Sequence, residues 1–128
     1  MAKIKLFDVH HPKNIGQKIK KIFKSGVITE GKYSLKFEKK ICEFLKNPNC
    51  VLVNSGTSAL TLAYRLANIQ INDEVVVTPL TCMATNQPLD NLGAKLKFVD
   101  VNYQTGNVDT DDLKKKVTKN TKCISLVH

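Results

Sequence analysis

The spacing of hydrophobic and polar positions changes at about residue 50 of the chain. Before that point, apolar residues recur three to four positions apart, a pattern typical of amphipathic helices. One helix is predicted over Pro12–Lys24. A second has Phe37, Ile41 and Phe44 on one face and ends before Asn47-Pro48-Asn49, a sequence that favours a turn. The first part of the chain is therefore predicted to be helical.

After residue 50, short apolar runs alternate with helical patterns. Such alternation predicts a parallel β-sheet with helices against its faces. The helix over Thr57–Asn68 is expected to turn its alanines and leucines inward. The predicted strands are Val51–Val53, Glu74–Val77, Leu96–Val99 and Cys123–Val127, and the other helices are Thr81–Leu92 and one capped by Asp109.

These elements predict an α/β fold in which N-terminal helices precede an incomplete, mostly parallel sheet with flanking helices. The expected division is a helical segment over residues 1–49 and an α/β part over residues 50–128. The last predicted strand runs to the final residues with no helix after it. Since a strand of a parallel sheet needs a crossover to cover it, the chain is expected to be a fragment.

The net charge of +9 is concentrated in the first 50 residues. A basic segment of this kind suits nucleic acid, an anionic membrane or a phosphorylated substrate. The sequence has little arginine, no interleaved aromatic residues and no nucleic-acid motif. A lysine-coated helical surface is therefore the favoured interpretation, and neither nucleic acid nor a membrane is an expected partner.

Four cysteines, Cys42, Cys50, Cys82 and Cys123, are widely spaced and form no CxxC pair. The N-terminal residues have no continuous apolar stretch typical of a secretory signal, so a cytoplasmic location and reduced, mostly buried thiols are expected. No metal site is predicted, because the histidines at 10 and 11 are far along the chain from any cysteine.

Candidate chemistry lies at the start of the helix that follows Val51–Val53. A turn containing Asn54, Ser55 and Gly56 opens an Ala/Leu-rich helix. The N–H groups and the positive dipole end of such a helix bind phosphate readily. An ordinary helix cap by Asn54, Ser55 or Thr57 is the alternative. The turn has one glycine and no GxGxxG, which excludes a dinucleotide-binding Rossmann motif.

Several segments, in this order and spacing, resemble the DegT/DnrJ/EryC1/StrS family of sugar aminotransferases. These enzymes have the aspartate-aminotransferase fold and use pyridoxal 5'-phosphate (PLP). The resemblance implies that the predicted sheet is part of the large, PLP-binding domain. The matching segments are Ser25–Gly31, Asn54–Leu60, Asn72–Pro79, Leu80–Asn86, Phe98–Val101 and Asn107–Asp109.

The resemblance gives Gly56, Thr57 and Ser58 the role of holding the cofactor phosphate. It places Cys82 where many members have an aromatic residue stacked on the pyridine ring. A buried small residue is the alternative for Cys82.

The resemblance also implies substrate contacts. Thr85 and Asn86 are candidates for the pocket lining, and the loop containing Thr29 and Gly31 falls where the family approaches its substrate, often from a dimer partner. Plain turn chemistry is the alternative for that loop.

The family resemblance implies transfer of an amino group from glutamate or glutamine to a nucleotide-linked keto-sugar, by a homodimer. The lysine that binds PLP covalently and the acidic partner of its ring nitrogen have no matching context in this sequence. No catalytic residue is therefore assigned, and the chain alone is expected to be inactive. The alternative is a non-catalytic phosphate-binding or interaction module derived from the same fold.

Overall fold

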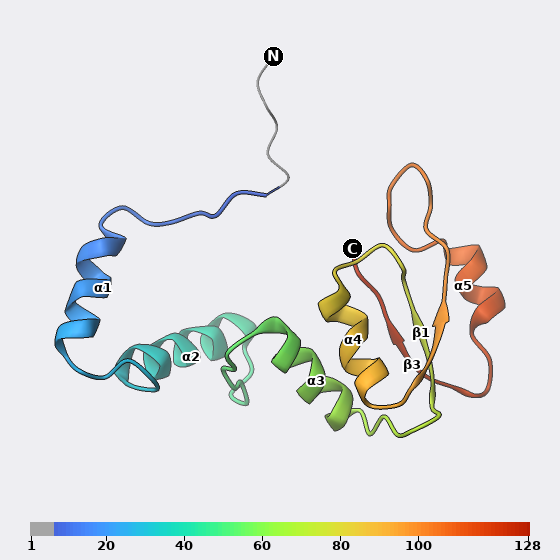
Figure 1. Cartoon of the computed structure of the whole chain (residues 1–128), viewed down its shortest axis with the longest axis horizontal. Coiled ribbons are helices and arrows are strands. Elements are labelled where there is room, and N and C mark those ends of the chain that lie inside the picture. The colour runs from blue at the N-terminus through green and yellow to red at the C-terminus, as the bar shows by residue number, and fades with distance from the viewer. Residues whose placement is uncertain (1–6) are drawn as a thin grey trace, which may run out of the picture. The chain divides into compact units, whose positions relative to one another are not determined.

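The computed structural model describes residues 7–128, which form two compact units (Figure 1). The first unit ends at Leu52 and the second begins at Val53. Within residues 7–128, no helix is both long and apolar enough to cross a membrane.

The first unit contains two helices, α1 (Ile15–Lys24) and α2 (Lys32–Leu45), as the apolar spacing predicts. Helix α1 begins after Asn14, so the proline at position 12 precedes the helix instead of starting it. No side chain of α1 or α2 is buried. Helix α2 is capped by the next residue, Lys46, whose left-handed backbone (φ 51°) turns the chain sharply.

The second unit is a three-stranded parallel sheet with helices, which confirms the predicted fold class. The strand order is β2-β1-β3, and both neighbours of β1 run parallel to it. Figure 1 shows α4 and α5 on opposite sides of the strands. The elements in order are α3 (Gly56–Leu66), β1 (Glu74–Val77), α4 (Met83–Asn91), β2 (Lys95–Phe98), α5 (Thr110–Lys116) and β3 (Thr121–Ser125).

The core of the second unit is built on the central strand. The three valines of β1, Val75 to Val77, are completely buried. Because side chains alternate across a strand, Val75 and Val77 share one face and Val76 faces the other side. Packed with Val75 and Val77 are Tyr64, Ile69, Leu89 and Leu92.

The predicted strand over Val51–Val53 is wrong. These residues form no strand, and Val51 is 73% exposed. The backbone N–H of Leu52 donates instead to Oε1 of Glu38, a helix α2 side chain, at 3.2 Å. A strand exists only beside a hydrogen-bonded neighbour, and none of the described strands pairs with this segment.

The predicted inward face of α3 is also wrong in most positions. Tyr64 is the one buried residue of this helix, whereas Leu66 is 78% exposed and Leu62 is exposed as well. Leu60 packs against the core one turn before Tyr64. Residues four apart lie on one face, so the contact stripe runs through Leu60 and Tyr64.

The predicted cap of the last helix is confirmed. The Asp109 carboxylate accepts hydrogen bonds from the N–H groups of Asp111 and Asp112, at 2.9 and 3.0 Å. Acidic residues occupy the first turn of α5 and lysines the last, the order that the helix dipole favours.

Candidate functional site

The N-terminal end of α3 is organised by a local network of polar side chains. Ser55 caps the helix by accepting a hydrogen bond from the Ser58 N–H at 3.1 Å. The Ser58 hydroxyl donates to Oδ1 of Asn54 at 2.7 Å. It also lies 2.9 Å from the Ser55 hydroxyl. Both polar hydrogens of Ser58 are thus used within the turn.

Gly56 and Thr57 supply the unused donors. Within residues 7–128, neither backbone N–H has a hydrogen-bond partner, as is usual in the first turn of a helix. The side chain of Thr57 is exposed. A Cβ atom added at Gly56 would have no neighbour within 4 Å. The glycine therefore leaves open space beside two free N–H groups, which fits close approach by a phosphate.

The residue after β1, Thr78, is buried at the carboxyl end of the central strand. Thr78 is only 2% exposed, and its carbonyl accepts a hydrogen bond from Nδ2 of Asn86 at 3.1 Å. In the part of the chain that the structure describes, Thr78 Oγ1 and Asn86 Oδ1 are buried without a partner. Ligands of parallel sheets bind at the carboxyl ends of the strands, where these atoms lie. Buried polar groups of this kind are usually satisfied by water or ligand.

Tyr64 links three elements near this end of the sheet. Its hydroxyl lies 2.7 Å from the Ser125 hydroxyl at the end of β3 and donates to the Thr85 carbonyl in α4 at 3.3 Å. This junction fixes α3 and α4 against the sheet. Sequence reasoning missed it, since Tyr64 and Ser125 are 61 residues apart.

Two of the predicted site residues lie at the start of α4: Cys82 directly precedes this helix, and Thr85 lies in its first turn. Cys82 is the residue preceding α4, and its side chain is exposed, so the alternative of a buried Cys82 is wrong. Cys42, Cys50 and Cys123 are half-buried, so the expectation of mostly buried thiols is wrong as well. Thr85 shares a hydrogen bond of 2.8 Å with the Thr81 hydroxyl.

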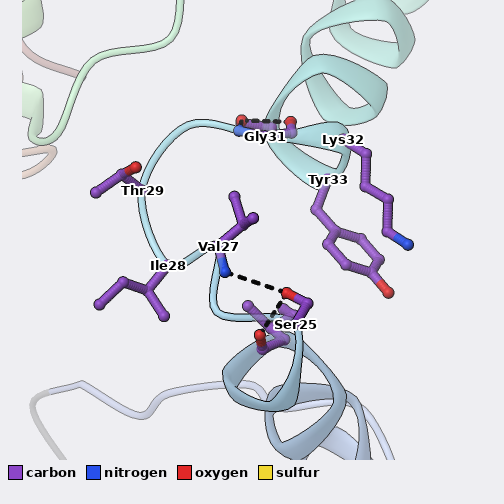
Figure 2. Close-up of a pocket in the computed structure, with 9 residues that line it drawn as sticks. Ser25, Val27, Ile28, Thr29, Gly31, Lys32 and Tyr33 are labelled. Carbon is purple, nitrogen blue, oxygen red and sulfur yellow. Dashed lines mark hydrogen bonds between the residues drawn. The ribbon is translucent and has the colours of Figure 1, made fainter.

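The predicted substrate loop lines a pocket in the first unit (Figure 2). The pocket has a volume of about 510 Å³, within the range of small-molecule sites. Thr29 and Gly31 both border it. The Lys32 ammonium lies 5.3 Å from the centre of the Tyr33 ring, so a cation and an aromatic ring stand together at its edge.

Gly31 is required at its position by steric contact. Its backbone is extended, and an added Cβ would lie 2.8 Å from Cγ1 of Val27. The Gly31 N–H donates to the Ser34 hydroxyl at 2.9 Å, and that hydroxyl donates back to the Gly31 carbonyl at 2.8 Å. The loop is thus closed tightly onto the start of α2. Thr29 and Gly31 belong to the first unit, whereas the other predicted site residues belong to the second.

Two carboxyl groups of the second unit have lowered pKa values. Hydrogen bonding by Thr121, with the nearby Lys97, lowers the pKa of Glu74 at the amino end of β1. The backbone N–H of Asp100 and the Lys116 ammonium lower the pKa of Asp112. Both carboxylates stabilise the fold. Within residues 7–128, no group of three or more His, Cys, Asp or Glu side chains is arranged to hold a metal ion.

Comparison with known proteins identifies the family of this chain. Residues 10–128 match the DegT/DnrJ/EryC1/StrS aminotransferase family. The chain belongs to this family. It is 35% identical over 102 residues to the GDP-perosamine synthase of Vibrio cholerae, a match that covers 80% of this chain and 28% of that protein.

Solved structures of family members have the same fold. The sugar aminotransferase CalS13 from Micromonospora echinospora is 34% identical, with a TM-score of 0.84 over 98% of this chain and 34% of CalS13. The E. coli GDP-4-keto-6-deoxy-D-mannose-3-dehydratase with bound hydrated PLP is 27% identical, with a TM-score of 0.84 over 97% of this chain and 33% of that chain. The chain therefore spans about a third of the length of these family members.

Proposed function

We propose that this chain is the phosphate-binding part of a PLP-dependent nucleotide-sugar aminotransferase. The observation that carries the proposal is the N-terminal end of α3, where the Gly56 and Thr57 N–H groups have no partner within residues 7–128. The chain that carries this helix start belongs to a family of aminotransferases. A related structure contains PLP. The whole enzyme would transfer an amino group from glutamate or glutamine to a nucleotide-linked keto-sugar.

In this proposal the start of α3 holds the cofactor phosphate. The N–H groups of Gly56 and Thr57 and the Thr57 hydroxyl would donate to its oxygens, with the helix dipole adding attraction. The Ser58 hydroxyl would join them by turning away from Asn54. Cys82 would lie beside the pyridine ring. PLP itself supplies an electron sink for the reaction.

Two segments are proposed to contribute substrate contacts. Thr85 and Asn86 would contact the substrate, and the Asn86 side-chain oxygen, which has no partner within residues 7–128, offers an acceptor to a sugar hydroxyl. Thr29 and Gly31 would approach the substrate through the loop before α2. The proposal includes a homodimer that works in the cytoplasm, and it assigns no catalytic residue to this chain.

Titration of the 128-residue chain with inorganic phosphate and with PLP, followed by NMR of the backbone amides, tests the phosphate site. We expect the largest shifts at Gly56 and Thr57. The start of α5 is an internal control, because its N–H groups are bonded to Asp109 and its first turn is acidic. Equal shifts at both helix starts, or none at α3, would contradict the proposal.

Substitution of Thr57 tests whether its hydroxyl donates a hydrogen bond to the phosphate. Thr57→Val keeps the shape of the side chain and removes one hydroxyl, so the affinity for phosphate should fall about fivefold, the value of one hydrogen bond of ~1 kcal/mol. Thr110→Val is the control, since Thr110 is an exposed threonine in the first turn of α5, as Thr57 is in the first turn of α3. Unchanged affinity in Thr57→Val would remove this hydroxyl from the site.

Borohydride reduction tests the proposal that this chain contains no lysine that binds PLP covalently. After PLP is added to the chain, reduction should leave no adduct confined to one lysine. A stable adduct at a single lysine would show that the chain carries a covalent cofactor site and would overturn this part of the proposal.

A dehydratase is a second candidate function for the whole enzyme, favoured by the likeness to the E. coli GDP-4-keto-6-deoxy-D-mannose-3-dehydratase. Both reactions would use the same phosphate site. Product analysis of the whole enzyme with a nucleotide-linked keto-sugar and glutamate separates them: an amino-sugar supports the aminotransferase, and a deoxy-keto-sugar supports the dehydratase.

A further inference from the structure

Two cysteines of the first unit, Cys42 in α2 and Cys50 after it, donate their thiols to the same short turn. The Cys42 thiol donates to the Pro48 carbonyl at 3.6 Å, and the Cys50 thiol donates to the Asn47 carbonyl at 3.4 Å. Asn47 and Pro48 are consecutive residues. The two sulfur atoms are therefore anchored on neighbouring carbonyl groups of the same turn.

The turn that carries these carbonyls is well defined. The Asn47 N–H donates to the Cys42 carbonyl at 3.0 Å, which folds the chain back against the end of α2. The Asn47 side chain accepts a hydrogen bond from the Asn49 N–H at 2.9 Å. Lys46 has left-handed backbone, which reverses the chain direction between the two cysteines. The approach of the thiols thus follows from backbone geometry.

We propose that Cys42 and Cys50 are a modification site at which a peroxide forms a reversible intramolecular disulfide. Both side chains are half-buried, so a small oxidant reaches them while a larger protein thiol is hindered. Burial, followed by the neighbouring Cys42 thiol, raises the pKa of Cys50.

The chemistry is a two-step oxidation by hydrogen peroxide. The Cys42 thiolate attacks one peroxide oxygen, the O–O bond breaks, and a sulfenic acid and hydroxide form. The Cys50 sulfur then attacks the Cys42 sulfur, the S–S bond forms, the S–O bond breaks, and water leaves with the proton of the Cys50 thiol. Overall, two thiols lose two electrons and two protons, and one peroxide becomes two waters.

The other two cysteines serve as controls within the same chain. Cys82 precedes α4 and is exposed, and Cys123 lies in β3 beside Val75. Both belong to the second unit. Neither makes a side-chain hydrogen bond within residues 7–128, so no local geometry brings them to a partner.

Peptide mapping after peroxide treatment of the folded 128-residue chain tests the proposal directly. Trypsin cleaves after Lys46, so the disulfide would join two separate peptides, residues 41–46 and 47–65. We expect this linked pair as the main oxidised product, and its loss on treatment with dithiothreitol. Cys42→Ser and Cys50→Ser should each abolish it, whereas Cys82→Ser and Cys123→Ser should leave its yield unchanged.

A comparison with the unfolded chain separates fold geometry from closeness in sequence. In concentrated urea the two thiols are still eight positions apart, so some linkage forms through chain flexibility. We expect the Cys42–Cys50 disulfide to resist reduction by glutathione at least about tenfold better in the folded chain. Equal resistance in both states, or linkage of either cysteine to Cys82 or Cys123 with the same yield, would overturn the proposal.

Discussion

Tyr64→Phe is the most informative substitution for the geometry of the second unit. The change removes one oxygen atom and keeps the ring, so the packing of the 5% exposed side chain against the core is preserved. Two hydrogen bonds are lost, one to the Ser125 hydroxyl and one to the Thr85 carbonyl. The Thr85 carbonyl is then left without this partner at the junction between α3, α4 and β3.

The expected loss of stability follows from these two contacts. A buried hydrogen bond contributes ~1 kcal/mol, and the Thr85 contact is the longer of the two, so the free energy of unfolding should fall by about 1.5 kcal/mol. For a chain of this size that loss corresponds to a decrease in Tm of about 5 °C. Ser125→Ala should cost about 1 kcal/mol, because it removes the shorter bond alone.

Urea denaturation followed by circular dichroism measures these changes. The double variant Tyr64→Phe with Ser125→Ala completes a cycle, in which the two single losses should exceed the combined loss by about 1 kcal/mol. Tyr103→Phe is the matched control, since Tyr103 is fully exposed and should leave stability unchanged. Additive losses in the cycle, or a Tyr64→Phe variant as stable as the control, would refute the proposed junction.

Three further predictions concern the fold. Gly93→Ala should lower the free energy of unfolding by more than about 1 kcal/mol, because Gly93 has φ +74° and an added Cβ would lie 3.1 Å from Cγ1 of Ile71. Gly16→Ala is the control and should be neutral or stabilising, because Gly16 lies in α1 with open space around it. Thermal unfolding measures both variants. Asp109→Ala should cost ~1 kcal/mol in urea unfolding through loss of the α5 cap, and Asp109→Asn should restore most of it. The pKa of Glu74 is lowered from its usual 4.5, so the carboxylate stabilises the fold fully above pH 4.5, and this stabilisation is lost as the pH falls below that value. In Glu74→Gln, the free energy of unfolding measured over a pH series should no longer show this part of the fall at acid pH. The same pH dependence in the variant and the original chain would contradict the assignment.

The parallel sheet was predictable because its strongest signal is local. The run of valines at Val75 to Val77 is followed by a helical pattern and then by another short apolar run, and this order implies a crossover. The same reasoning failed at Val51–Val53. That run has the same length and is equally apolar, but a strand also requires a neighbour, which three residues of sequence do not reveal.

The start of α3 was predictable as a donor site, and the surroundings of β1 were not. Small polar residues before an Ala/Leu-rich segment indicate a helix start, and the structure has that start at Gly56. The inward face of α3 could not be predicted, because apolar residues lie on several sides of this helix and only Leu60 and Tyr64 pack against the core. The pairing of Thr78 with Asn86 depends on how α4 packs against β1, which the pattern of either segment alone does not fix.

The position of β1 at the centre of the sheet also sets the order in which the chain can fold. Glu74 lies beside Lys95 on one side and beside Thr121 on the other, and the second partner is 47 residues away. Closing a longer loop costs more entropy, so the β1–β2 pair should assemble first and β3 should dock last. Until it docks, one edge of the buried valine strand lacks its neighbour, and during that interval the chain is most prone to pair with another copy and aggregate.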